Sequence, residues 1–265
     1  MSWRRLGRRL AAQAVGTLTS VTTTAPVIAL TFDDGPDPAS TPRLLELLAR
    51  HQARATFFMV GLAAQRHPGL VQQVAQAGHA IGNHSWDHPS FPLISGRERR
   101  EQLRAGARAL APHGLRLFRP PYGHQNLASR LDALRLGYEV VAWTAAAVDW
   151  EARSPEWMAE RMLSQARPGA IVLLHDALFD ALEPGYVDRA PMLAALESVL
   201  TRLAGRYRFV SLPELLRHGR PHRELWSRSA PAEWLNTLRR PEGGPRRYPV
   251  PPAGANTPGY PEGNL

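Results

Sequence analysis

Thr31-Phe32-Asp33-Asp34-Gly35-Pro36 sets two carboxylates at the end of a short apolar run, Val27-Ile28-Ala29-Leu30. The apolar run predicts a buried strand, and Gly35 and Pro36 favour an immediate turn. A plain strand end followed by a turn would explain the same residues. However, adjacent like charges are costly unless a cation or a difference in role separates them. We therefore ask whether the rest of the chain supplies a cation.

Short apolar runs alternate with helical patterns from residue 26 to residue 216. The predicted strands span 27–32, 55–60, 79–83, 115–118, 139–143, 170–174 and 207–211. The predicted helices span 41–52, 68–77, 97–111, 127–136, 155–166 and 190–204. This alternation favours a parallel sheet, and seven units in about 190 residues fit a closed or nearly closed barrel. The predicted fold class is α/β, a distorted (β/α)7 barrel similar to a TIM barrel.

Charge and composition separate the two ends of the chain from this barrel. All 32 basic residues are arginine, and the net charge is +9. Residues 11–216 are almost neutral, so the excess lies in residues 1–10 and 217–265. We divide the chain into a basic N-terminal arm or export signal (1–25), a barrel (26–217) and a Pro/Gly/Arg-rich, largely irregular tail (218–265). Within the tail we expect one weak helix at 231–238 and disorder over 248–265.

The N-terminal arm has the charged head of an export signal, with Arg4, Arg5, Arg8 and Arg9 ahead of a short apolar stretch. Gln13 interrupts that stretch, so an amphipathic or disordered basic arm is the alternative. The arginine-rich ends favour an anionic envelope or membrane surface as a partner, and we expect no nucleic acid. The predicted location is extracytoplasmic or membrane-associated, at the cell envelope, with a cytoplasmic location left open.

Polar groups follow five of the predicted strands, where a parallel barrel carries its functional residues. The chain has no cysteine, so any metal must be held by histidine and carboxylate. The five groups are Asp33-Asp34, His84-Ser85-Trp86-Asp87-His88, Arg119-Pro120-Pro121-Tyr122-Gly123, Val148-Asp149-Trp150 and Leu173-Leu174-His175-Asp176.

Two histidines four residues apart, His84 and His88, can point at one ion from a single helical turn. By itself, this pair would be interpreted as two histidines on the protein surface. With Asp34 they complete one carboxylate and two imidazoles, the ligand set of a catalytic zinc-like site with a position left open for water. Arg119 by itself would suggest an ordinary salt bridge, and His175 a hydrogen-bonded core residue. At one rim with the carboxylates, they indicate a fixed cation and an acid or base.

In this order, the motifs TFDDGP, HSWDH, RPPYG, VDW and LLH resemble the polysaccharide deacetylase family, the NodB-homology or carbohydrate esterase family 4 domain. The resemblance covers about residues 26–216. It implies a distorted (β/α) barrel and metal-dependent hydrolysis of N-acetyl, sometimes O-acetyl, groups on sugars. The family often has Asp-x-x-Asp-Trp at its fourth motif, and Ala146 stands at the first position here.

The resemblance also implies a role for each motif residue. Asp33 would be the general base, and Asp34, His84 and His88 the metal ligands. Arg119 would hold Asp33, and Asp149 would orient His175, the general acid. The Tyr122 backbone N–H would stabilise the oxyanion. The substrate-binding residues would be Pro120, Tyr122, Trp150 and Leu173, with Trp150 and Leu173 as walls for the acetyl methyl.

We thus predict a hydrolase that removes acetyl groups from N-acetylated sugars of a peptidoglycan-like or chitin-like polysaccharide, with that acetylated glycan as its partner. One divalent ion is expected, with zinc favoured and cobalt, nickel or manganese as alternatives. An O-acetyl esterase or a small-molecule amidohydrolase would use the same metal chemistry. A carbohydrate-binding protein that keeps the fold without catalysis is a third reading.

Overall fold

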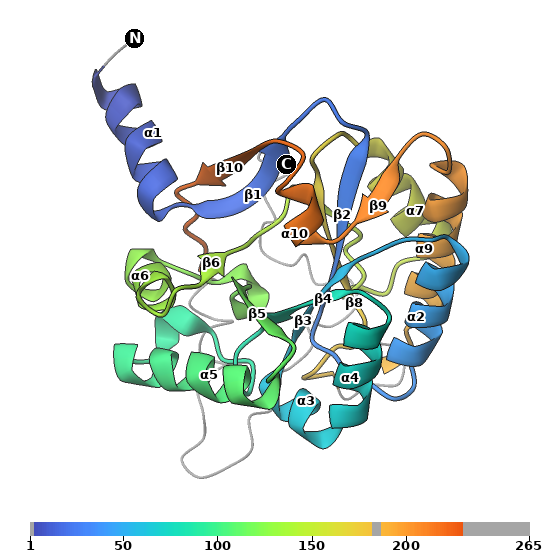
Figure 1. The fold of residues 1–265 in the computed structure, drawn as a ribbon, viewed down its shortest axis with the longest axis horizontal. Coiled ribbons are helices and arrows are strands. Elements are labelled where there is room, and N and C mark those ends of the chain that lie inside the picture. Colours follow the sequence, from blue (N-terminus) through green and yellow to red (C-terminus); the bar gives the residue numbers. More distant parts are fainter. Residues whose placement is uncertain (1–2, 182–186, 230–265) are drawn as a thin grey trace.

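The computed structural model describes residues 3–181 and 187–229. Its centre is a parallel sheet that curls into an open barrel, with helices packed outside it (Figure 1). Hydrogen-bonded neighbours follow the order β6-β5-β4-β3-β2-β8-β7, and β9 pairs with the start of β2. The strands are β2 (Val27–Asp33), β3 (Thr56–Met59), β4 (Ala80–Asn83), β5 (Gly114–Phe118), β6 (Glu139–Val140), β7 (Ala145–Ala146), β8 (Ile171–His175) and β9 (Arg208–Val210). The predicted parallel α/β barrel is confirmed.

The helices begin and end where their sequence signals place them. Ser95 and Glu98 form a reciprocal capping box at the start of α5, and Pro68 opens α4. The helices are α2 (Thr41–Arg50), α3 (Gly61–Arg66), α4 (Pro68–Gln76), α5 (Gly96–Ala109), α6 (Leu127–Arg135), α7 (Pro155–Ser164), α9 (Ala190–Arg202) and α10 (Leu212–Leu215), with 3₁₀ turns η1 (Phe91–Leu93) and η2 (Pro121–Gly123). Each of the six predicted helices ends within two residues of its observed bounds.

The core lies on both faces of the sheet, and β2 shows how the two faces are divided. Ile28, Leu30 and Phe32 pack outward against the surrounding helices. Val27 and Ala29 point into the barrel, with residues of β8 such as Leu173. The alternation of a strand therefore carries Thr31 and Asp33 along the inner face to the carboxyl edge of the sheet.

A strand outside the predicted barrel range, β1 (Thr17–Thr22), closes the gap between β6 and β8. Leu18 bridges Val141, and Ser20 bridges Ala170. The Ala142 N–H donates to the Leu18 carbonyl over 2.8 Å, and Leu18 is fully buried. The predicted strand at 139–143 is observed as β6 over Glu139–Val140, and the backbone that follows it bridges from β5 to β1. The barrel wall begins near residue 17 rather than at residue 26.

The predicted tail also contributes to the fold, through β10 (Arg220–Glu224), which pairs antiparallel with β1. Beyond it, the Trp226 indole donates to the Gly123 carbonyl over 3.1 Å, and Gln125 and Arg228 exchange backbone hydrogen bonds. Residues 220–228 therefore support the η2 turn and differ from the irregular tail expected there. The expected helix at 231–238 and the expected disorder over 248–265 lie outside the described residues.

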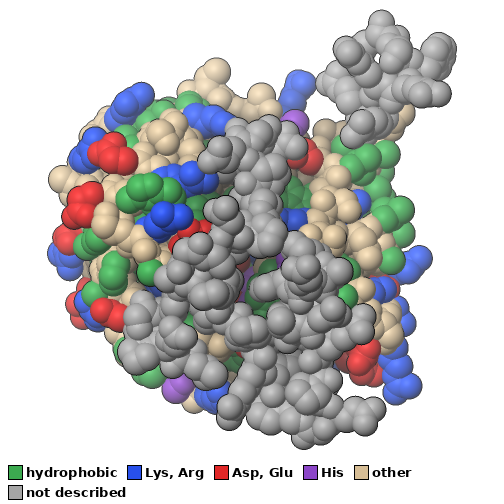
Figure 2. Space-filling view, turned by 180° about the vertical axis from the view of Figure 1, so that it is seen from behind, with side chains coloured by type: hydrophobic (Ala, Val, Ile, Leu, Met, Phe, Trp, Pro, Cys, Tyr) green, Lys and Arg blue, Asp and Glu red, His purple; other side chains and the backbone are tan. Residues whose placement is uncertain are grey.

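Helix α1 (Trp3–Val15) precedes β1, contacts β10 and α6, and extends away from the barrel (Figure 1). Among the described residues, no helix is long and apolar enough to cross a membrane. On the face shown in Figure 2, arginine side chains lie interspersed with acidic ones. Exposed pairs such as Arg50–Glu197 and Arg208–Glu214 agree with a barrel that is close to neutral.

Candidate metal centre and active site

Three buried side chains from two strand ends, Asp34, His84 and His88, converge at the carboxyl edge of the sheet. One ligand atom from each lies within 4.8 Å of the other two. Asp34 Oδ1 is 3.3 Å from His84 Nε2 and 3.2 Å from His88 Nε2. The predicted ligand set is therefore brought together, with both imidazoles aimed at one carboxylate oxygen.

The backbone of the site loops is held in an unusual conformation. Among the described residues, six that are not glycine have a positive φ, and five of them lie in the predicted motifs. These five are Asp34 (78°), Ser85 (74°), His88 (59°), Tyr122 (59°) and Val148 (59°). Left-handed backbone costs on the order of 1 kcal/mol or more for such residues, and it persists where the surroundings enforce it. The fold is thus less stable at these positions, and the strained backbone orients these side chains toward the site.

Hydrogen bonds on the far side of each imidazole decide which nitrogen can bind an ion. His84 Nδ1 is 2.7 Å from the Arg119 carbonyl oxygen, which can only accept, so Nδ1 carries the hydrogen. His88 Nδ1 is 2.8 Å from Asp180 Oδ2, with the same consequence. Both Nε2 lone pairs then face Asp34. This donor set fits a divalent ion bound by two nitrogens and one oxygen.

The charges at this point favour a bound cation. Burial alone would raise the pKa of Asp34, but His88 and His84 lower it well below its ordinary value. Burial also opposes a proton on His88, yet Asp34 and Asp180 raise the His88 pKa to about 10. A positive charge between the carboxylate and the imidazoles is therefore stabilised, whether a proton or a metal ion supplies it.

Asp33 faces a different partner from its neighbour. The fully buried Arg119 donates from Nη1 to Asp33 Oδ1 over 2.7 Å and to the Thr31 hydroxyl over 2.8 Å. Arg119 also donates from Nη2 to the Ala142 carbonyl and lies over the Phe58 ring. The other oxygen of Asp33 is 3.8 Å from His84 Nε2. Asp33 is thus fixed through one oxygen, while the other faces the candidate ligands.

Asp149 and His175 form a hydrogen-bonded pair, with His175 next to Asp33 in the β2–β8 register. Asp149 Oδ1 is 2.9 Å from His175 Nδ1, and Asp149 Oδ2 accepts the His175 backbone N–H over 2.8 Å. Burial favours the neutral form of each, but their mutual attraction raises the His175 pKa and, with Arg189, lowers that of Asp149. Because Nδ1–H points at Asp149, the other nitrogen of His175 is free to exchange a proton.

The predicted substrate-contact residues surround these groups. The Tyr122 ring packs on His88 with 4.4 Å between centroids, and Trp150 meets His175 edge to face. Leu173 is buried on the inner face of β8. Pro120 lies directly before the η2 turn, and its carbonyl accepts the Gly123 N–H. Ala146, where the family motif often has Asp, lies in β7 beside Leu173.

Sequence reasoning missed several polar residues that complete the site. Arg189 is buried and donates to the Asp149 carboxylate, to the Asp149 carbonyl over 3.0 Å and to the His175 carbonyl over 3.3 Å. Asp176 lies in the fifth motif without a predicted role, and it accepts from the Gly35 N–H and the Thr41 hydroxyl. Asp180 contacts His88. None belongs to a periodic pattern, and an isolated Arg or Asp in a loop usually faces solvent.

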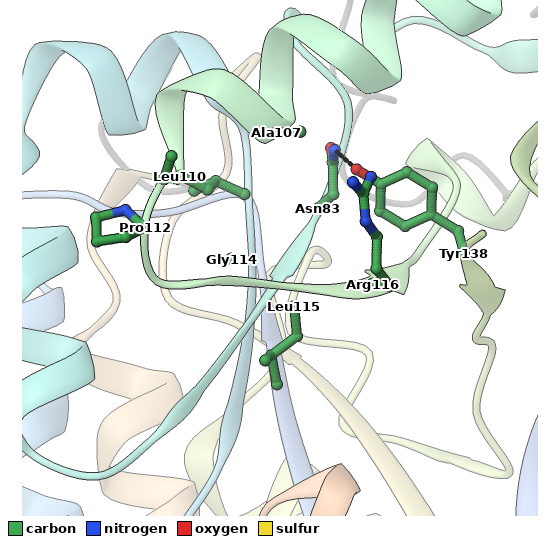
Figure 3. Close-up of a pocket in the computed structure, with 9 residues that line it drawn as sticks. Asn83, Ala107, Leu110, Pro112, Gly114, Leu115, Arg116 and Tyr138 are labelled. Atoms are coloured by element: carbon green, nitrogen blue, oxygen red, sulfur yellow. Dashed lines mark hydrogen bonds between the residues drawn. The ribbon is translucent and has the colours of Figure 1, made fainter. Parts of the chain in front are cut away.

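A cavity of about 200 Å³ lies elsewhere, between α5 and β5 (Figure 3). On its wall, the Asn83 amide donates to the Tyr138 hydroxyl over 3.0 Å. Its lining residues are Asn83, Ala107, Leu110, Ala111, Pro112, Gly114, Leu115, Arg116 and Tyr138. No predicted site residue lines it, so the cavity is separate from the chemistry at the carboxyl edge.

Comparison with known proteins agrees with this geometry. The family model described as polysaccharide deacetylase matches residues 20–141. A peptidoglycan-N-acetylglucosamine deacetylase of Bacillus cereus is 40% identical over 197 residues, covering 72% of this chain and 89% of that protein. A chitooligosaccharide deacetylase of Azorhizobium caulinodans is 36% identical over 203 residues, covering 72% of this chain and 95% of that protein.

A solved structure resembles the whole barrel. The Bc1960 peptidoglycan N-acetylglucosamine deacetylase, in complex with 4-naphthalen-1-yl-N-oxidanyl-benzamide, superposes with a TM-score of 0.71 at 28% identity. The match covers 80% of this chain and 98% of that one.

Proposed function

The chain belongs to the polysaccharide deacetylase family, and from that premise we propose that it hydrolyses N-acetyl groups on the amino sugars of a peptidoglycan-like or chitin-like polysaccharide. The observation that carries this proposal is the meeting of three units at one edge of the sheet. These are the Asp34–His84–His88 cluster, the Arg119-held Asp33 and the Asp149-held His175. The names of the relatives support the substrate class.

Asp34, His84 and His88 would hold one divalent ion. When bound, the ion would supply Lewis acidity toward the acetyl carbonyl and toward water. Two imidazole nitrogens and one carboxylate oxygen favour zinc, with cobalt, nickel or manganese as alternatives.

Asp33 would act as the general base of the hydrolysis. The Arg119 guanidinium fixes one of its oxygens, so the other can accept a proton from the attacking water. The water oxygen bonds to the acetyl carbon, and the Tyr122 backbone N–H would stabilise the negative charge that develops on the carbonyl oxygen.

His175 would act as the general acid at the opposite side of the acetyl group. Asp149 holds its Nδ1–H, which leaves the proton on the other nitrogen for the departing amine. As the carbon–nitrogen bond breaks, the sugar nitrogen takes this proton, and acetate and a free amine result. Trp150, Leu173, Pro120 and Tyr122 would surround the acetyl methyl.

The test is acetate release by the metal-reconstituted protein from three substrates in parallel: chitooligosaccharide, N-acetylated peptidoglycan and acetylated xylan. We expect release from the N-acetylated glycans and, on each of them, at least about 100-fold slower release by Asp33→Asn. Release from xylan alone would favour the esterase reading. Glycan binding without acetate, by protein that holds its metal, would favour a non-catalytic binding protein.

Action at the cell envelope is the location that this substrate class supports. The arginine-rich ends would hold the enzyme to an anionic envelope or membrane surface without taking part in the chemistry. Residues 1–16, which precede β1, would serve as that basic arm or as an export signal.

A further inference from the structure

The segment that follows β8, residues 177–181, lies over the candidate metal ligands although it carries no recognised motif. The Phe179 backbone N–H donates to Asp34 Oδ2 over 3.1 Å. The next residue, Asp180, places Oδ2 2.8 Å from His88 Nδ1. Two adjacent residues therefore contact two of the three ligands, each on the side away from the shared point.

The two histidines differ in what accepts their Nδ1–H. His84 donates to a neutral backbone carbonyl, that of Arg119. His88 donates to the Asp180 carboxylate, whose side chain is 15% exposed. A carboxylate acceptor fixes the tautomer and ring orientation, and it also makes the facing Nε2 a stronger electron donor. His88 is thus the ligand whose strength depends on a second charged residue.

The same oxygen of Asp180 also accepts the Tyr122 hydroxyl over 2.8 Å. The Tyr122 ring packs on His88, and its backbone holds a φ of 59°. One carboxylate oxygen therefore joins a ligand to the η2 turn, which would carry the oxyanion donor. Movement of Asp180 would disturb both.

We propose that Asp180 is a positioning residue that holds His88 as a metal ligand and links it, through the Tyr122 hydroxyl, to the η2 turn. This inference rests on the proposed metal site. It means that the metal affinity and the rigidity of that site depend on a carboxylate in a loop outside the five motifs.

The test measures the affinity of the full chain for Zn²⁺ and Co²⁺, by competition of metal-free protein with a chromophoric chelator. We expect Asp180→Ala to weaken binding about 10- to 100-fold, the usual effect of losing such a partner. Asp180→Asn should fall between this variant and the wild type, because its amide oxygen accepts the same bond without the charge. Tyr122→Phe should bind metal almost as the wild type does.

The matched control is Asp188→Asn, which alters an exposed carboxylate that caps Ala190 in the same connection. It should leave metal affinity unchanged. If Asp180→Ala fails to fold, the isosteric Asp180→Asn gives the answer. Affinity of the folded Asp180 variants equal to that of Asp188→Asn would overturn the inference, whatever their activity. A wild-type protein that binds metal but releases no acetate would contradict the proposed function and leave this inference standing.

Discussion

Asp33 and Asp34 are neighbours in sequence but face different partners, because the backbone changes direction between them. Asp33 continues the inward alternation of β2 and meets Arg119. Asp34 has a φ of 78° and turns toward His84 and His88. Each carboxylate thus has its own positive partner. For Asp33 this is Arg119, and for Asp34 it is the proton or metal ion held with the two imidazoles.

Because Asp33 and the metal ligands have separate partners, substitution of Asp33 and substitution of a ligand should have different effects. Asp33→Asn should keep its metal and lose at least about 100-fold in turnover, since a general base contributes 10²- to 10⁴-fold. His84→Ala should lose both metal and turnover. Metal content and acetate release of the purified variants decide the matter, and an Asp33→Asn protein isolated without metal would show that the two aspartates have been exchanged.

Arg189 gives a second prediction at this scale. Its guanidinium bonds to both members of the Asp149–His175 pair, so Arg189→Met should lower kcat by about tenfold or more through misplacement of the acid. Arg99→Met is the matched control, because Arg99 is also buried but pairs with Asp132 instead. Metal content should be unchanged in both. Equal kcat values for the two variants would contradict a positioning role for Arg189.

Asp176 predicts how stability depends on pH. Burial raises its pKa from 3.8 to about 7, so the native protein keeps a proton that the unfolded chain releases. Between these values the native state holds the Asp176 proton more often than the unfolded chain does, so the contribution of Asp176 to the free energy of unfolding falls as pH rises from about 4 to 7. Asp176→Asn should remove this fall, which is worth a few kcal/mol in total.

Denaturant unfolding of metal-free wild type and Asp176→Asn at several pH values between 4 and 8 measures the difference. Metal-free protein is required because a cation at Asp34 would favour the ionised carboxylate. Parallel pH dependences of the two proteins would show that Asp176 is not the titrating group.

At the scale of helices and strands, the sequence was most informative where apolar periodicity and end signals agreed. Pro68 and the Ser95–Glu98 box mark helix starts that the structure reproduces, and the apolar run at 170–174 marks β8 within one residue. The five motifs predicted the ligand cluster because parallel strands end at one edge.

The elements that sequence reasoning missed are stabilised by their partners rather than by their own pattern. In β10, Arg-Pro-His-Arg-Glu has proline as its one apolar residue and no apolar alternation, and its place is determined by β1. Asp180 and Arg189 lie in a connection without periodicity, so their contacts with His88 and Asp149 follow from the path of the chain in space. Local sequence carries little information about such long-range contacts.

The role of β1 can be tested directly. Leu18 is fully buried inside the barrel, so Leu18→Ala should lower the free energy of unfolding by about 2–5 kcal/mol. Thr22→Ala, at the exposed end of the same strand, should change it by less than about 0.5 kcal/mol. Chemical denaturation gives both values, and an unaffected Leu18→Ala protein would show that β1 is dispensable to the barrel.

At the scale of the whole molecule, the net charge of +9 belongs to the ends of a nearly neutral barrel. Each arginine near an anionic membrane contributes about 1 kcal/mol, and the attraction decays over roughly 8 Å at physiological salt. Binding of the full chain to vesicles containing anionic lipid should therefore weaken steeply as salt is raised. A fragment of residues 16–229, which keeps β1 and β10, lacks the four arginines of residues 1–10 but retains Arg217, Arg220, Arg223 and Arg228, so it should bind more weakly and with a shallower dependence on salt.

Hydrolysis of a short neutral chitooligosaccharide should be the same for the fragment and the full chain. Vesicle sedimentation and acetate release measure the two properties on the same samples. A fragment that is folded and loaded with metal, yet unable to cleave this substrate, would place the chain ends within the active site.

The pairing of β1 with β10 has a consequence for how the protein is made. β10 is synthesised roughly 200 residues after β1, about 10–40 s later at ordinary elongation rates. During that interval one edge of β1 is an unpaired strand edge, the kind of surface on which nascent chains aggregate and which chaperones cover. The β1–β10 ribbon can therefore be completed only after the strands and helices between them have been made.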